Sequence, residues 1–76
     1  MDEEILIDAR GFHCPVPTLK LRRVLERAPA GARVRLLADD PMARIDVPHF
    51  ASEAGVEVLE CRTEGAGSSF LVRKKP

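Results

Sequence analysis

The fold is decided by residues 5–28, ILIDARGFHCPVPTLKLRRVLERA, in which a strand-like run of apolar residues is followed by apolar residues at helical spacing. The short apolar run Ile5-Leu6-Ile7 is typical of a strand, and it ends at Asp8. From Pro15 onward the apolar residues recur at the spacing of an amphipathic helix. Pro29-Ala30-Gly31 is a cluster of helix breakers. This stretch therefore predicts a strand, a connection containing a glycine, and a helix.

The next two elements are predicted from alternation and from a capping pattern. Alternate positions of residues 34–38 are apolar, which indicates a strand. Asp39-Asp40-Pro41 offers an acidic N-cap and a proline at the first helical position, so we expect a second helix to begin there. Pro48 lies inside that helix, where we expect a kink, a tightened turn or a restart capped by Asp46. Gly55 is a suitable C-terminal stop.

The last part of the chain predicts a β-hairpin. Residues 56–62 and 69–73 have the composition of strands, and Glu64-Gly65-Ala66-Gly67 lies between them. The predicted order is β-α-β-α-β-β in a single domain over residues 1–76. An α/β (α+β) two-layer sandwich, with two helices on one face of a four-stranded mixed sheet, buries one apolar face of each element.

Composition argues against several classes of function. The 76 residues contain 12 Lys plus Arg and 12 Asp plus Glu, so the excess positive charge of a nucleic-acid binder is missing. Trp and Tyr are absent, which leaves three Phe as the aromatic residues available to stack on bases. The start, Met1-Asp2-Glu3-Glu4, is acidic where a signal peptide is basic, and no apolar stretch is long enough to span a membrane. We expect a cytoplasmic domain whose thiols stay reduced.

Cys14 is the candidate reactive residue. It stands directly before Pro15, which fits the first helical position, and Pro17 stiffens the same turn. A helix N-terminus favours a nearby anion, so we expect the pKa of the Cys14 thiol to be lowered. His13 beside it adds positive potential. A buried structural cysteine is the alternative interpretation, but a Pro-x-Pro helix start is an unusual place for one.

Several motifs together resemble the TusA (SirA-like) sulfur-carrier family. The resemblance begins with residues 6–17, which contain Gly11-Phe12-His13 and the Cys-Pro-x-Pro sequence at Cys14. It continues through the Asp-Asp-Pro turn at 39–41, Asp46-Val47-Pro48 with Phe50, Ala54-Gly55 and residues 70–74. A lone Cys-Pro-x-Pro would be weak evidence, but this combination covers nearly the whole chain.

The resemblance implies a fold like the C-terminal domain of bacterial translation initiation factor three and a sulfurtransferase activity. It implies that Cys14 accepts sulfane sulfur as a persulfide, supported by Gly11, His13, Pro15 and Pro17. The implied donor is a cysteine desulfurase or a rhodanese. The implied acceptors act in tRNA thiolation, molybdenum-cofactor or sulfur-oxidation pathways. No metal or organic cofactor is implied, and a monomer is expected.

Partner contacts are implied around the cysteine, with Arg22 and Asp40 as the candidates. Arg22, Arg23 and Arg27 form a basic stripe on the first helix, which is either a solvated face or a docking surface. The sequence departs from many family members at three places. Val16 replaces an acidic residue, Ile45 replaces an arginine, and Ala51 replaces a second cysteine, so partner choice is open and internal disulfide chemistry is disfavoured.

The remaining candidates have structural explanations. We expect Cys61 to occupy a half-buried strand position on the same face as Leu59, without a role in resolving a disulfide. His13 and His49 lack further ligands at metal-binding spacing. The alternative functions are a non-catalytic regulatory or RNA-binding module on the same fold, and a thiol redox switch that would need Cys61 as its partner.

Overall fold

The expected alternation of strands and helices is present. The computed structural model describes residues 4–65 and 67–75. In chain order its elements are β1 (Glu4–Asp8), α1 (Val16–Arg27), β2 (Arg33–Ala38), α2 (Ala43–Ala54), β3 (Val56–Glu64) and β4 (Gly67–Lys74). The predicted β-α-β-α-β-β order is confirmed.

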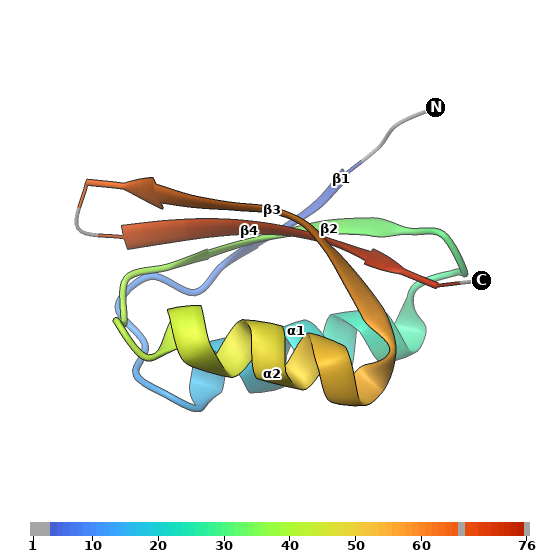
Figure 1. Cartoon of the computed structure of the whole chain (residues 1–76), viewed down its shortest axis with the longest axis horizontal. Coiled ribbons are helices and arrows are strands. Elements are labelled where there is room, and N and C mark those ends of the chain that lie inside the picture. Colours follow the sequence, from blue (N-terminus) through green and yellow to red (C-terminus); the bar gives the residue numbers. More distant parts are fainter. Residues whose placement is uncertain (1–3, 66, 76) are drawn as a thin grey trace.

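The strands form one mixed sheet in the order β1-β2-β4-β3. β1 runs parallel to β2, whereas β4 pairs antiparallel with both β2 and β3. Both helices lie on the same face of this sheet and begin at the same end of the molecule (Figure 1). The two-layer α/β (α+β) sandwich is therefore confirmed. Because α1 follows β1 and α2 follows β2, the loops before both helices meet at that end.

The hydrophobic core fills the space between the sheet and the helices. Along β2, burial alternates residue by residue, and the buried side chains point toward the helices. The fully buried core side chains include Leu21 of α1, Leu36 of β2, Val47 of α2 and Phe70 of β4. One buried residue from each of these four elements thus anchors both helices to the central strands.

Helix α2 begins later than the sequence predicts. Its first helical residue is Ala43, with Met42 as the N-cap, so the expected start at Asp39-Asp40-Pro41 is wrong. The Asp40 carboxylate accepts the Met42 N–H at 2.9 Å in a turn that precedes the helix. The expected restart capped by Asp46 is also wrong, because one helix runs through Pro48 to Ala54. Gly55 ends it in the left-handed conformation, with φ of 70°, as predicted.

The hairpin is longer than predicted and contains a register shift. β3 extends to Glu64, and β4 begins at Gly67. Ala66 of the predicted turn lies outside the described residues. A bulge falls between Val58 and Glu60, after which Cys61 is paired with Phe70. This shift breaks the alternation that related Cys61 to Leu59. Cys61 is exposed on the edge strand, so the prediction of a half-buried position is wrong.

The face of the sheet opposite the helices carries ion pairs. The Arg35 guanidinium pairs with Glu4 at 3.0 Å and with Glu60 at 3.2 Å, and it donates to the Ser69 hydroxyl at 2.9 Å. Arg35 therefore bonds to residues of the three other strands.

Neither helix in the described part of the chain is long and apolar enough to cross a membrane.

Candidate functional site

The loop that carries Cys14 is tied to the neighbouring loop through backbone groups. Gly11 has φ of +88°, a left-handed conformation that favours glycine, and its N–H donates to Asp39 Oδ1 at 2.9 Å. The Cys14 N–H donates to Asp40 Oδ2 at 2.6 Å. The Cys14–Pro15 peptide bond is cis. Two adjacent aspartates after β2 thus hold the loop that follows β1, because parallel strands bring these two loops to one end of the sheet.

Asp40 joins the cysteine loop to the start of α2. One of its oxygens accepts the Cys14 N–H, and the other accepts the Met42 N–H at 2.9 Å. These two backbone donors, that of Met42 first, lower the pKa of the Asp40 carboxyl below its ordinary value. His13 adds a smaller effect from Nδ1, which lies 3.8 Å from Asp40 Oδ2. The predicted partner-contact residue Asp40 is therefore a structural support of the cysteine.

The thiol of Cys14 is exposed and donates a hydrogen bond to Asp46 Oδ2 of α2. This bond raises the pKa of the Cys14 thiol, and partial loss of hydration and the negative charges of Asp46 and Asp40 raise it further. The prediction of a lowered pKa is therefore wrong. A carboxylate in contact with sulfur stabilises the protonated thiol and repels the thiolate.

The first turn of α1 also supplies less positive potential than expected. Pro15 is the N-cap rather than the first helical residue, and Pro17 lies in the first turn, so neither provides an N–H. The Val16 N–H already donates to the His13 carbonyl at 2.9 Å. The first turn therefore offers fewer free donors to an anion at the sulfur than expected, and the hydrogen bond to Asp46 is the largest cause of the raised pKa of the Cys14 thiol.

Comparison with known proteins identifies the family to which this fold and this cysteine loop belong. The family model described as Sulfurtransferase TusA matches residues 5–74. The chain belongs to the TusA family. The match includes the Cys14 loop, both aspartates after β2 and Asp46. The predicted family resemblance is thereby confirmed.

Individual TusA relatives resemble the chain over nearly its whole length. Sulfur carrier protein TusA of Allochromatium vinosum is 34% identical over 73 residues, which is 96% of this chain and 93% of the relative. Sulfur carrier protein TusA of Pseudomonas putida strain W619 is 32% identical over 72 residues, covering 95% and 90%. The crystal structure of a SirA-like protein from Desulfitobacterium hafniense has a TM-score of 0.81 and 26% identity, covering 95% of this chain and 99% of that one.

Among the site residues predicted from the TusA motif, the structure brings some together and leaves Arg22 apart. Gly11, His13, Pro15 and Pro17 lie in the Cys14 loop and the first turn of α1. The imidazole of His13 is 93% exposed, so it faces solvent. Within the described residues, no group of three or more metal-ligating side chains occurs.

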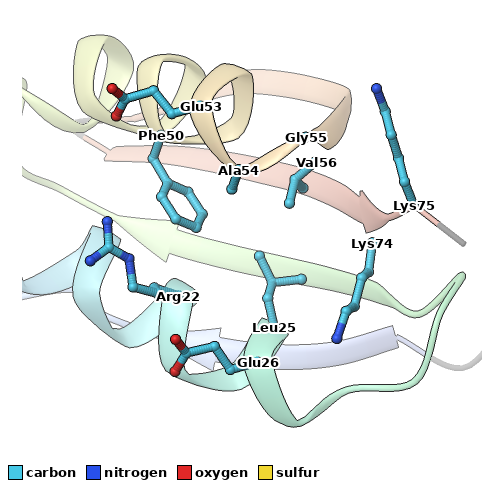
Figure 2. Close-up of a pocket in the computed structure, with 10 residues that line it drawn as sticks. All are labelled: Arg22, Leu25, Glu26, Phe50, Glu53, Ala54, Gly55, Val56, Lys74 and Lys75. Atoms are coloured by element: carbon cyan, nitrogen blue, oxygen red, sulfur yellow. The ribbon is translucent and has the colours of Figure 1, made fainter.

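Arg22 lies at a surface groove between α1 and α2. Its guanidinium lies 5.4 Å from the centre of the Phe50 ring, an arrangement that favours a cation–π contact. Figure 2 shows both side chains at a groove between α1 and α2, with Leu25, Glu53 and Lys74 also lining it. The groove has a volume of about 490 Å³. Arg22 thus contacts the ring of Phe50, a buried side chain of α2, rather than the Cys14 loop.

Exposed apolar side chains lie close to Cys14 in the sequence and on α2. Phe12 is 43% exposed and has the Lys20 ammonium 4.7 Å from its ring centre. Met42 and Ile45, which surround the start of α2, are 45% and 63% exposed. Phe12 also lines a groove of about 620 Å³ between β1 and α1. A TusA-family cysteine is suited to contact with another protein surface when its own loop and the start of the neighbouring helix carry exposed apolar side chains.

The roles of Asp46 and Asp39 do not follow from the sequence. The sequence pattern predicts that both are capping residues, since each precedes a proline-containing segment that resembles a helix start. In the structure they bind Cys14 Sγ and the Gly11 N–H instead. The signal was present in the TusA motifs Asp-Asp-Pro and Asp-Val-Pro, but spacing alone does not show which atoms a carboxylate will meet.

Proposed function

We propose that this TusA-family chain is a sulfurtransferase that carries sulfane sulfur as a persulfide on Cys14. The observation that supports the proposal most is the placement of Cys14. Its thiol is exposed in the loop directly before α1, and its backbone is held by Asp40. The domain provides a fixed position for one sulfur atom and leaves the sulfur accessible to a second protein.

The transfer conserves atoms and electrons. Cys14 loses its proton, and its sulfur attacks the outer sulfur of a donor persulfide, R–S–SH. The new bond joins Cys14 Sγ to that outer sulfur, the S–S bond of the donor breaks, and the donor leaves as R–S⁻. The leaving thiolate takes up one proton, so the products are Cys14–S–SH and R–SH. Because thiol–disulfide chemistry of this kind depends on access to the sulfur, an exposed cysteine suits it.

The partners follow from the carrier role. We propose a cysteine desulfurase or a rhodanese as the sulfur donor and a downstream protein thiol as the acceptor, in tRNA thiolation, molybdenum-cofactor or sulfur-oxidation pathways. Both exchanges need a reduced thiol, which fits the cytoplasm. In this proposal Gly11, Pro15 and Pro17 shape the loop, while Phe12 and Met42 provide apolar contact area.

Intact-mass measurement tests the proposal. After incubation with a rhodanese and thiosulfate, the parent protein should gain the mass of one sulfur atom, which dithiothreitol should remove. Cys61→Ala should retain the added sulfur because Cys61 lies on the edge strand away from the Cys14 loop. Cys14→Ala should lose it. An adduct of unchanged yield in Cys14→Ala would contradict the assignment.

A further inference from the structure

Three carboxylates lie around Cys14, but they act on different atoms. Asp39 accepts the Gly11 N–H at 2.9 Å, and Asp40 accepts the Cys14 N–H at 2.6 Å. These two bonds position the backbone. Only Asp46 accepts a hydrogen bond from the sulfur atom itself. Asp46 belongs to the first turns of α2, where its own N–H donates to the Met42 carbonyl at 2.8 Å, so its carboxylate is held by a helix.

We propose that Asp46 is a positioning residue that keeps the unloaded Cys14 as a neutral thiol directed at α2, and releases it once the cysteine carries a persulfide. The persulfide part of this inference rests on the proposed function. The restraint on the thiol rests on geometry alone: the sulfur touches a carboxylate oxygen, while its own backbone is fixed by a second carboxylate.

The charged groups around the sulfur favour the protonated form. From α2 comes Asp46, and from the preceding turn comes Asp40, and both raise the pKa of the Cys14 thiol. The cations of the cysteine loop are directed to other groups. Arg10 pairs with Asp8 at 2.8 Å, and His13 lies 3.8 Å from Asp40. The unloaded thiol therefore meets negative charge from two directions, and the fraction of thiolate at neutral pH is reduced.

Loading with sulfur changes this interaction. In Cys14–S–SH the inner sulfur carries no proton, so it cannot donate the hydrogen bond to Asp46. The ionisable proton moves to the outer sulfur, one S–S bond of about 2.05 Å further out. A persulfide is intrinsically more acidic than a thiol, and repulsion from Asp46 turns the anion away from α2 toward solvent. The empty carrier is then held mainly as the neutral thiol, which must lose its proton before it attacks a donor, whereas the loaded carrier is anionic and presented to the acceptor.

The pH dependence of alkylation tests the restraint. The rate of reaction with iodoacetamide would be measured against pH in a Cys61→Ala background, so that Cys14 is the reacting thiol. Asp46→Asn should shift the rate profile to lower pH and increase the rate at neutral pH several-fold, because the repelling charge is removed. Asp46→Glu should stay closer to the parent. Glu53→Gln removes one negative charge further along the same helix and should leave the profile unchanged.

A second measurement uses the unsubstituted site in case Asp46→Asn does not fold. Raman spectroscopy of the Cys61→Ala protein should show the S–H stretch of Cys14 at a lower frequency than that of Cys61 in Cys14→Ala. The difference is expected because an S–H bonded to a carboxylate is weakened, whereas Cys61 is exposed on an edge strand. Equal frequencies, or identical rate profiles for the parent and a folded Asp46→Asn protein, would overturn the proposal.

These readouts are independent of sulfur transfer. If Cys14 fails to form a persulfide but Asp46→Asn still shifts the alkylation profile, the proposed function is wrong and the restraint on the thiol remains. If the persulfide forms normally and the profile does not shift, the function stands and the role of Asp46 is wrong. Mass measurement and alkylation kinetics on the same samples distinguish these outcomes.

Discussion

At the scale of single residues, the environment of Cys14 depends on which atom each aspartate binds. Asp40 binds the backbone N–H and Asp46 binds the side-chain sulfur. A backbone donor lowers the pKa of the carboxylate that it contacts, and a carboxylate raises the pKa of the thiol that it contacts. Two aspartates six positions apart therefore have different roles: Asp40 supports the loop, and Asp46 controls the reactivity of the thiol.

Replacing Asp40 should reduce stability in a pH-dependent way. The pKa of Asp40 is lower in the folded protein than in the unfolded chain, so its contribution is present above the unfolded pKa and is lost as pH falls through the folded pKa. Asp40→Asn should lower the Tm at neutral pH by a few degrees. The difference from the parent should shrink on acidification below the ordinary aspartate pKa of about 3.9.

Thermal unfolding followed by circular dichroism across this pH range checks the prediction. Glu53→Gln serves as the control, because it also removes one carboxylate, but one that pairs with the exposed His49 side chain rather than with the backbone N–H groups that Asp40 holds. A Tm difference for Asp40→Asn that is the same at neutral and acidic pH would rule out the proposed linkage.

At the scale of elements, helix α2 shows that the tertiary structure decides which potential helix breaker ends a helix. Pro48 lies within the helix without ending it, whereas Gly55 ends the helix in the left-handed conformation. The Ala51 carbonyl accepts the Gly55 N–H at this end. A proline near the start of a helix removes one hydrogen bond, but packing of Val47 and Phe50 against the sheet stabilises the segment on both sides of it.

Substitution of Gly55 should destabilise the protein by a purely local effect. A Cβ placed at Gly55 would meet no atom within 4 Å, so the cost arises from its φ of +70°. Gly55→Ala should lower the free energy of unfolding by about 1 kcal/mol, as measured by urea denaturation. Gly55→Asn should lose less, since asparagine tolerates this conformation. Equal losses in both variants would show that the conformation is not the cause.

At the scale of the whole molecule, stability depends on a small core shared by both layers. A domain of this size buries only about 60% of the surface that its unfolded chain exposes. Its α1 helix contacts the core through Leu21 and Leu25, both buried. On the outer face of the sheet, Arg35 links the strands through pairs with Glu4 and Glu60. The domain therefore has few alternative contacts if one core side chain is lost.

Two leucines of the same helix provide a matched test of this core. Leu21 is 0% exposed and Leu19 is 50% exposed. Leu21→Ala should lower the free energy of unfolding by about 2–5 kcal/mol, enough to leave a domain of typical stability partly unfolded. Leu19→Ala should change it by less than about 1 kcal/mol. Urea denaturation compares the two, and similar losses would contradict the placement of Leu21 in the core.

The sequence by itself determined the order of the elements, the two-layer fold class, the family and the candidate thiol. These properties depend on local signals: the hydrophobic periods around residues 5–28, the breakers, and the spacing of the Cys-Pro-x-Pro motif. Only the tertiary structure decided the chemistry around Cys14. Gly11 meets Asp39 across 28 positions, and Cys14 meets Asp40 and Asp46 across 26 and 32 positions.

The order of the strands explains two further differences between the structure and the predictions from the sequence: the raised pKa of the Cys14 thiol and the exposure of Cys61. The parallel pairing of β1 and β2 brings the loops before α1 and α2 together, which places carboxylates beside a sulfur that local reasoning placed at a positive helix end. The position of β3 at the edge, with its bulge, leaves Cys61 exposed. A hydrophobic period reports which face of an element is buried. Which polar atoms meet beyond that face depends on the packing of elements that are distant in the chain.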